Sequence, residues 1–315
     1  MSGRVARRSP NDAGRHVAPE ILGVPIGRPG KILWPAEGLN KPIDKLTLGR
    51  YFKTVGYWIL PYVAGRPCSI LRAPDGISGP RFPQRNAVPG THPLFDRIGV
   101  NTEARPLLQI GRFAALVALA QEGALELHTW NCRPHRPAVP GRLVFDLDPG
   151  PGVTVSAVVR AAWELKERLD RLGLTAFCKT SGGKGLHLVV PLDAPVEELT
   201  WAEARNFSRD LCAMMAEAGA GRYTVAAKDS RRDRIFLNWL GNDQGGMTLS
   251  LLSPRAQPGA LVSMPLDWSD VTVDLDPTRY TVRTAPALLI ERTPWAAYDS
   301  SRGSLRGALK RLAET

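Results

Sequence analysis

Cysteine is scarce in this sequence, with four in 315 residues and no two of them in a CxxC pair. Cysteines so few and so widely spaced do not make a disulfide framework, and reduced thiols are expected. Long apolar runs are missing as well, since none approaches the ~18 residues that a membrane span needs. The first 20 residues contain no apolar stretch, so we expect no secretory signal there. We therefore expect a cytoplasmic protein.

Acidic residues are also in the minority. The chain has 30 Asp and Glu against 41 Lys and Arg, which gives a net charge of +11 at pH 7. A basic surface concentrates polyanions, so nucleic acid, nucleotides or an anionic membrane surface are the candidate partners. The apolar fraction of 43% is enough for a packed core and excludes a disordered or collagen-like chain.

The chain has no Ser/Gly linker and no internal repeat that would divide it. We expect a flexible basic arm over residues 1–20 and one domain over residues 21–315. Apolar periodicity predicts helices at 45–62, 107–124, 158–172, 201–216 and 305–312. Short apolar runs bounded by turn residues predict strands at 143–147, 176–179, 186–192 and 234–240. Helices that alternate with strands indicate an α/β or α+β layered fold.

Two aspartates, Asp146 and Asp148, end the strand predicted at 143–147 and precede a Pro-Gly-Pro-Gly turn. Residues i and i+2 of a strand share one face, so both carboxylates project together. Two close carboxylates repel each other, so the pair is stable mainly with a cation between them, and oxygen ligands favour Mg²⁺ or Mn²⁺. The alternative is a solvated pair at a strand end with no function.

Two classes of enzyme use such an Asp-x-Asp pair. In phosphatases with an aspartyl nucleophile, Gly-Thr usually follows the pair, whereas Pro149 and Gly150 follow it here, in the middle of the chain. In nucleotidyltransferases, the pair holds two metal ions that clamp the attacking and leaving oxygens. The remaining motifs decide between the two classes.

A glycine-rich turn, KTSGGKG at residues 179–185, joins two predicted strands. Its glycines let backbone amides approach an anion, and Ser181, Lys184 and His187 add donors and charge. The spacing is not that of a P-loop, and a strand rather than a helix follows. A tight hairpin with one exposed lysine is the alternative, but the neighbouring aspartate pair favours phosphate binding.

His128, Cys132 and His135 lie close enough in sequence to imitate a zinc cluster. A structural zinc site needs a fourth ligand, which this spacing does not supply. We therefore favour a role for His128 in contacting a nucleotide or in the core.

Taken together, these blocks resemble the polymerase domain of bacterial ATP-dependent DNA ligase D, in the archaeo-eukaryotic primase superfamily. The matching blocks are KILWP (31–35), ILRAPDGI (70–77), ELHTW (126–130), VFDLDPGPG (144–152), KTSGGKGLH (179–187), RIFL (234–237) and PLDW (265–268). The resemblance implies a primase-polymerase fold, in which an RRM-like antiparallel catalytic sheet packs beside a second α/β half. It also implies extension of DNA ends with NTPs or dNTPs in non-homologous end joining, in the bacterial nucleoid, with Ku and a DNA ligase as partners and no membrane.

The resemblance also carries roles to individual residues. It puts Asp146 and Asp148 among the metal ligands, for Mg²⁺ or Mn²⁺ in a two-metal site, and puts His128 beside the nucleotide sugar. The expected triphosphate-binding residues are Ser181, Lys184, His187, Arg231 and Arg255. The expected DNA-binding residues are Lys31, Lys45 and Arg72, which would hold a 5′-phosphate, together with Phe82 and Arg85.

Two positions depart from the family pattern. The third metal-binding aspartate of the family is Asn238 here, and asparagine offers a neutral oxygen without charge. We expect Asp233 to lie on the wrong face to replace it, and Asp243 to reach the site only by a local rearrangement. Pro83 stands where relatives tend to have a second stacking aromatic.

Our leading hypothesis is therefore a stand-alone polymerase/primase domain whose catalysis is weakened at Asn238. The alternative, from another class, is a non-catalytic module that binds DNA ends and nucleotides and bridges ends. A phosphatase is a distant third.

Overall fold

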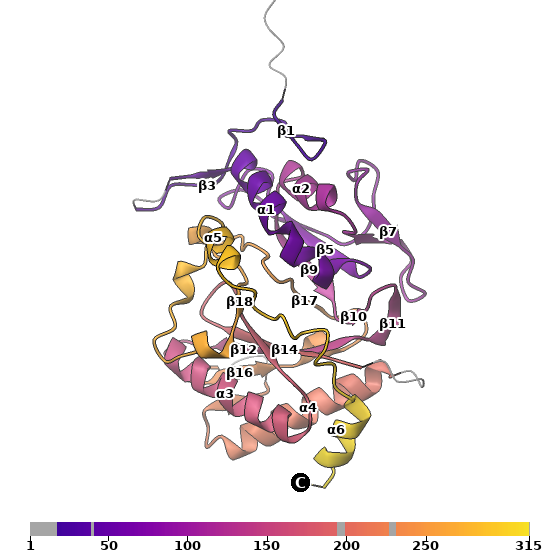
Figure 1. Cartoon of the computed structure of the whole chain (residues 1–315), viewed down its shortest axis with the longest axis vertical. Helices are drawn as coiled ribbons and strands as arrows, with labels where there is room; N and C mark the ends of the chain where they lie inside the picture. The colour runs from indigo at the N-terminus through magenta and orange to yellow at the C-terminus, as the bar shows by residue number, and fades with distance from the viewer. Residues whose placement is uncertain (1–17, 39–40, 194–198, 227–230, 315) are drawn as a thin grey trace, which may run out of the picture.

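The structure is a computed structural model that describes residues 18–38, 41–193, 199–226 and 231–314. Most of the predicted N-terminal arm, residues 1–17, lies outside this part. The chain forms two halves, each built on a six-stranded sheet. In Figure 1 the N-terminal half, in indigo and purple, lies above the C-terminal half, in magenta and orange.

The N-terminal half packs two helices, α1 (Lys45–Val63) and α2 (Phe113–Gln121), against each other and beside a sheet. The Asp44 side chain caps α1 by accepting a hydrogen bond from the amide of Thr47 at 2.7 Å. The helices approach closely at Gly56, where a Cβ would lie 2.9 Å from the Phe113 ring. The sheet has the strand order β17-β9-β5-β8-β7, and β6 pairs with β5.

The strands of this half and its flanking ribbons are short. They are β1 (Glu20–Ile21), β2 (Val24–Pro25), β3 (Ile32–Trp34), β4 (Ile43–Asp44), β5 (Pro67–Arg72), β6 (Phe82–Gln84), β7 (Asp96–Ile98), β8 (Leu107–Gln109), β9 (Ala124–Trp130), β10 (Cys132–Arg133), β11 (Arg136–Pro140) and β17 (Met247–Leu249).

The helix predicted at 107–124 is wrong at its start. Residues 107–109 form strand β8, which pairs with β7 and β5, and the helix begins only at Phe113. The apolar residues run on almost without a break from the strand into the helix, so periodicity does not separate the two elements. Gly111 stands between them.

The C-terminal half follows the order β-α-β-β-α-β, which confirms the RRM-like antiparallel sheet. The elements are β12 (Arg142–Pro149), α3 (Val155–Arg171), β13 (Phe177–Thr180), β14 (Leu186–Pro191), α4 (Trp201–Ala218) and β16 (Ile235–Asn238). In space the strands lie in the order β16-β12-β14-β13, and each neighbouring pair is antiparallel. This order is that of the split β-α-β unit. Two short strands extend the sheet: β15 (Tyr223–Thr224), parallel to β16, and β18 (Pro265–Leu266).

Helices α3 and α4 contact this sheet, and their caps explain where they begin. Thr154 caps α3, and Thr200 with Glu203 forms a capping box at the start of α4. Along β12, Phe145 and Leu147 are buried, whereas the alternate residues Asp146 and Asp148 line a cavity. The strand therefore presents its apolar side to the core and its acidic side to the cavity.

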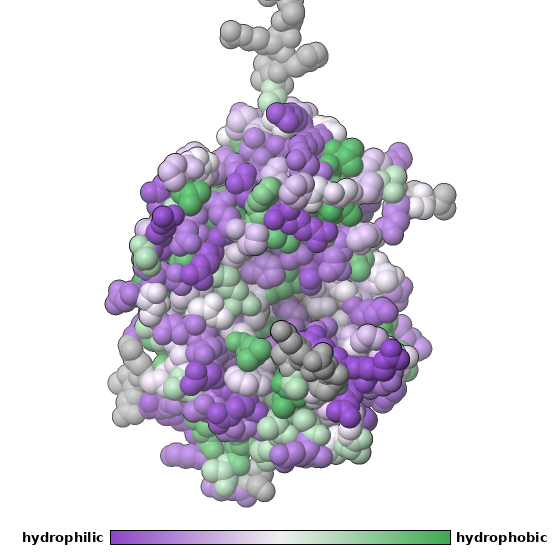
Figure 2. Space-filling view, turned by 180° about the vertical axis from the view of Figure 1, so that it is seen from behind, coloured by the Kyte–Doolittle hydropathy of each residue, from purple (hydrophilic) through white to green (hydrophobic). Residues whose placement is uncertain are grey.

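The remaining elements connect and cover the two halves. They are the helices α5 (Ala285–Ile290) and α6 (Leu305–Leu312) and the 3₁₀ turns η1 (Leu240–Asn242), η2 (Pro258–Ala260), η3 (Trp268–Asp270) and η4 (Pro277–Arg279). The strand predicted at 234–240 ends earlier, at Asn238, because the turn η1 follows it. No helix among the described residues has the length and apolarity to cross a membrane. Viewed from behind, the surface is mostly hydrophilic, with apolar residues in small groups (Figure 2).

Candidate active site

Strand register places four polar side chains in one row across the C-terminal sheet. Asp146 of β12 lies opposite Asn238 of β16 on one side and opposite His187 of β14 on the other. His187 in turn lies opposite Lys179 of β13. Cross-strand neighbours share a face of a sheet, so these four side chains form a continuous polar row.

Asp146 is the centre of this row. Its Oδ1 lies 3.2 Å from His187 Nε2, and its Oδ2 accepts a hydrogen bond from Asn238 Nδ2 at 3.2 Å. Burial alone would raise the pKa of Asp146, but His187, Asn238 and the charge of Lys179 outweigh burial and lower it. Asp146 is therefore an ionised, hydrogen-bonded carboxylate.

The pKa of Asp148 shifts in the opposite direction. Burial and the nearby charge of Asp146 raise its pKa, against the pull of Arg231, whose Nη1 donates a hydrogen bond to Asp148 at 2.7 Å. The two carboxylates thus repel each other, as the sequence predicts for residues that share one strand face. A divalent cation would relieve that repulsion, and carboxylate oxygens are the donors that Mg²⁺ and Mn²⁺ prefer. The pair therefore fits a divalent cation.

Asn238, at the position expected for a third metal ligand, does not add a carboxylate to the aspartate pair. The amide oxygen of Asn238 accepts a hydrogen bond from the backbone of Leu240 at 3.2 Å, so the NH₂ group faces Asp146. Neither alternative acid reaches the cavity: Asp233 lies in the turn before β16, and Asp243 pairs with Arg205 at 3.1 Å. The described residues include no group of three or more His, Cys, Asp or Glu arranged to hold a metal ion. That finding also speaks against the zinc cluster of His128, Cys132 and His135.

Lys179 closes the row at the far end and has no predicted role. Its side chain is 3% exposed, and Nζ donates hydrogen bonds to His187 Nδ1 at 3.0 Å and to Ser263 Oγ at 2.7 Å. Burial lowers the pKa of Lys179 to about 7, although Asp146 raises it in part. Because Lys179 donates to Nδ1, the Nε2 of His187 carries the proton that faces Asp146.

The glycine turn lies against the edge of this row. Gly182 has a φ of +68°, and a Cβ there would lie 2.5 Å from Arg255 Cγ, so the position requires glycine. Arg255 packs on the turn and donates from Nη1 to the carbonyl of Ser181 at 2.8 Å. The Lys184 side chain is exposed, and no hydrogen bond or ion pair to another described residue involves it.

Strand β9 contributes His128 to the opposite wall, and the buried Glu126 of the same strand lies outside the cavity lining. Glu126 Oε2 lies 2.9 Å from His128 Nε2, and Glu126 Oε1 accepts from Arg255 Nε at 3.0 Å. Burial opposes ionisation of Glu126, but these hydrogen bonds lower its pKa to about 2. Glu126 is the first residue of the motif ELHTW, and Lys179 is the first residue of KTSGGKGLH. Neither is predicted as a site residue, although a charged residue within a buried strand is a signal for one.

One cavity of about 310 Å³ joins these groups. It is lined by His128, Val144, Asp146, Asp148, Ser181, His187, Asn238, Gly241, Met247, Thr248, Leu249 and Arg255. Seven residues predicted for catalysis or nucleotide binding therefore meet in one place. Lys184 and Arg231 are not among the lining residues, and Arg231 contacts the site through Asp148.

The predicted phosphate-binding cluster occupies a second pocket, of about 280 Å³, in the N-terminal half. Lys31, Lys45 and Arg72 line it together with Arg28, which sequence analysis missed. Lys45 is buried and donates from Nζ to the carbonyl of Gly27 at 2.9 Å, and burial lowers its pKa. Four cationic side chains thus surround one small pocket, whose lining also includes the carboxylate of Glu122, paired with Arg72 at 3.1 Å, while Lys31 pairs with Asp75 at 2.6 Å.

The two other expected DNA-binding residues lie on or beside the neighbouring strand β6. Phe82 is 51% exposed and lies directly opposite Arg72 in the register of β5 and β6. Arg85 pairs with Glu103 at 2.6 Å. Pro83 lies within β6, a peripheral strand paired with β5.

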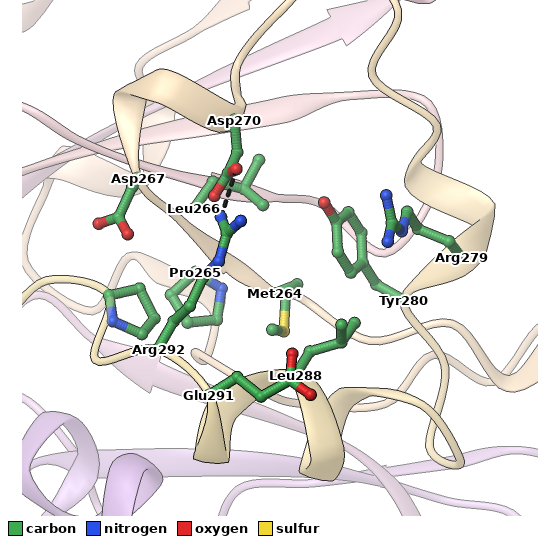
Figure 3. A pocket seen from close by; sticks show the side chains of 11 residues that line it. Met264, Pro265, Leu266, Asp267, Asp270, Arg279, Tyr280, Leu288, Glu291 and Arg292 are labelled. Carbon is green, nitrogen blue, oxygen red and sulfur yellow. Dashed lines mark hydrogen bonds and ion pairs between the residues drawn. The ribbon is translucent and has the colours of Figure 1, made fainter.

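A third pocket lies among β18, η3 and α5 and is lined by none of the residues predicted for catalysis, nucleotide binding or DNA binding, although it includes part of the PLDW block (Figure 3). Arg292 crosses it and pairs with Asp270, and Met264 and Leu288 form apolar walls. The central cation of this pocket therefore already has its counter-ion.

Comparison with known proteins identifies the family. The model of one family, described as LigD, primase-polymerase domain, matches residues 44–295. The chain belongs to the LigD primase-polymerase family. Its polymerase-domain fold, in which an RRM-like catalytic sheet packs beside a second α/β half, agrees with the expectation from sequence.

Two relatives and one solved structure give the extent of the likeness. The chain is 33% identical to the multifunctional non-homologous end joining protein LigD of Pseudomonas aeruginosa, over 98% of this chain and 36% of that protein. It is 29% identical to the LigD of Mycolicibacterium smegmatis, over 79% of this chain and 32% of that protein. The chain thus spans about a third of the length of these curated relatives.

The solved structure is the polymerase domain of Mycobacterium tuberculosis ligase D in complex with DNA. It superposes with a TM-score of 0.77 and 26% identity, and covers 88% of this chain and 98% of that chain.

Proposed function

We propose that this domain is a DNA-end-binding nucleotidyltransferase, which adds NTPs or dNTPs to a primer 3′-OH during non-homologous end joining. The observation that carries the proposal is the single cavity in which the carboxylates of Asp146 and Asp148 face Ser181 and Arg255. Paired carboxylates beside cationic and hydroxyl donors are the groups that a nucleotidyl transfer needs.

The nucleotide would lie between the two sheets. Ser181, Lys184 and Arg255 would bind the triphosphate through the glycine turn, while His128 on β9 would contact the sugar. Asp146 and Asp148 would hold Mg²⁺ or Mn²⁺, which when bound supplies positive charge for the attacking and leaving oxygens. His187 would position Asp146 through the hydrogen bond from Nε2, and Arg231 would position Asp148.

The DNA end would lie along the N-terminal half. Lys31, Lys45, Arg72 and Arg28 concentrate positive charge around a pocket large enough for a terminal phosphate. Phe82, exposed beside Arg72, would support the adjacent base, and Arg85 would contact the backbone. In this proposal a Ku protein and a DNA ligase complete the repair in the bacterial nucleoid.

A second candidate function rests on Asn238. Because its amide donates to Asp146, the third metal-binding position supplies no charge, and its oxygen already accepts from the backbone of Leu240. The domain would then extend primers slowly, or serve as a non-catalytic module that binds and bridges DNA ends.

Primer extension on a gapped duplex with a 5′-phosphate separates the two functions. Extension by the wild type that Asp146→Ala abolishes would support the polymerase. Binding of the DNA end and nucleotide, without extension in Mg²⁺ or Mn²⁺ and without any gain from Asn238→Asp, would support the bridging module. Absence of nucleotide binding would overturn both.

A further inference from the structure

Glu126 joins two parts of the cavity wall that are far apart in sequence. The side chain lies on β9, is 7% exposed, and is not among the residues that line the cavity. One oxygen, Oε2, forms a hydrogen bond with His128 Nε2 at 2.9 Å. The other, Oε1, accepts from Arg255 Nε at 3.0 Å and from the backbone amide of Ala256 at 2.9 Å. Both oxygens therefore have partners, one on each side.

Hydrogen bonding to the carboxylate is strong enough to overcome its burial. A buried carboxylate without partners would take up a proton, yet the pKa of Glu126 falls to about 2 because His128, Arg255 and Ala256 all donate to it. Glu126 is thus an ionised carboxylate that accepts hydrogen bonds from neighbouring residues and does not contact the cavity.

The contact with Glu126 fixes the ring orientation and the tautomer of His128. An ionised carboxylate only accepts hydrogen bonds, so His128 Nε2 carries a proton that points at Glu126. The opposite nitrogen, Nδ1, is the one left for a ligand, and His128 lines the cavity. Loss of the carboxylate would free the ring to rotate and to change tautomer.

The contact fixes Arg255 as well. Its Nε donates a hydrogen bond to Glu126, and its Nη1 donates one to the carbonyl of Ser181. The guanidinium plane is therefore held between β9 and the glycine turn, and its remaining N–H groups are available to the cavity that Arg255 lines.

We propose that Glu126 is a positioning residue that makes His128 and Arg255 one unit, so that recognition of the nucleotide sugar and of the triphosphate is energetically coupled. The inference rests on the proposed function, in which these two side chains contact the two ends of one nucleotide. A ligand that engages Arg255 thereby finds His128 already oriented, and the reverse holds equally.

The test is a double-mutant cycle on nucleotide affinity, measured by calorimetry with a non-hydrolysable α,β-methylene ATP analogue and Mg²⁺. With Glu126 present, His128→Ala and Arg255→Met should be non-additive, and the double mutant should bind better than the product of the two single losses by roughly fivefold or more. In a Glu126→Gln background, the same two substitutions should be additive within about twofold. Glutamine keeps the volume but removes the charge, and with its oxygen on Arg255 and Ala256 it turns an NH₂ group toward His128 Nε2, which reverses the direction of that hydrogen bond and breaks the charge-assisted link.

Glu164→Gln is the matched control, because Glu164 is a half-buried carboxylate that, like Glu126, accepts from two side chains, here Tyr223 and Arg168, but lies on helix α3 outside the cavity. It should leave both the affinity and the coupling unchanged. If Glu126→Gln does not fold, as judged by circular dichroism, Glu126→Asp serves in its place, since it keeps the charge but is too short to reach both partners.

The outcomes separate this inference from the proposed function. Equal coupling with and without Glu126, in a wild type that binds the analogue, would overturn the positioning role alone. A wild type that does not bind the analogue would overturn the proposed function, and the positioning role with it. Coupling that disappears with Glu126 and persists in Glu164→Gln would support both.

Discussion

The side-chain amide of Asn238 donates a hydrogen bond from Nδ2 to Oδ2 of Asp146 across 3.2 Å. The amide oxygen is held away from the carboxylate pair by the backbone N–H of Leu240. Asn238 therefore acts on Asp146 as a neutral donor, and its hydrogen bond lowers the pKa of Asp146. An aspartate at this position would instead add a third negative charge to the row, which only a bound cation could balance.

Asn238→Asp is accordingly expected to raise primer extension. Recovery of about 3–5 kcal/mol of transition-state stabilisation corresponds to a rate gain on the order of 10²–10⁴-fold, at about 1.4 kcal/mol per decade. Single-turnover extension of a gapped duplex measures the gain, and Mn²⁺ should partly relieve the deficit of the wild type. Nucleotide affinity should change little. Brisk extension by the wild type, with no gain from the aspartate, would mean that another acid completes the site, with Asp243 released from Arg205 as the first candidate.

Removal of the DNA 5′-phosphate tests the basic pocket. Lys31 and Lys45 line it, so the wild type should bind a gapped duplex more weakly without the phosphate, and its affinity should fall steeply with salt. The double variant Lys31→Ala, Lys45→Ala should bind both duplexes about equally. Because the Lys45 ammonium also holds the Gly27 carbonyl, thermal unfolding must accompany the titration. The same phosphate dependence in wild type and variant would contradict the assignment.

Lys184→Ala tests the glycine turn. Loss of one charge-assisted hydrogen bond to the triphosphate should weaken metal–nucleotide binding by about 1.5–3 kcal/mol, measured by calorimetry. The Lys184 side chain is exposed, so the free energy of unfolding should not change. Lys310→Ala, at an exposed position in α6, is the control for net charge and should bind as the wild type does. Unchanged affinity in Lys184→Ala would remove the turn from the nucleotide site.

Some of this site follows from sequence and some does not, for a physical reason. The shared face of Asp146 and Asp148 follows from strand geometry, which is local, and the β-α-β-β-α-β order follows from apolar periodicity. The hydrogen bond between Arg255 and Glu126 joins residues 129 positions apart, and the pairing of Arg231 with Asp148 joins residues 83 positions apart. The first contact depends on how the two halves pack and the second on how β12 pairs with β16, and no spacing rule encodes either. The wrong prediction of a helix over β8 has a local cause: an apolar run of this length is compatible with either a strand or a helix.

Lys179 should make the stability of the fold depend on pH. Its pKa is lowered by burial from 10.5 to about 7, so between these values the unfolded chain binds the proton and the native chain does not. The cost of charging the buried amine is fully present below pH 7 and is relieved as the pH rises toward 10.5. The free energy of unfolding should therefore increase with pH across this window, by at most about 1.4 kcal/mol per pH unit for one proton. Lys179→Met should remove that increase, whereas Lys310→Met should keep it, as urea unfolding between pH 7 and 10 would show. Parallel profiles for the wild type and Lys179→Met would contradict the depressed pKa, and with it the neutral amine beside His187.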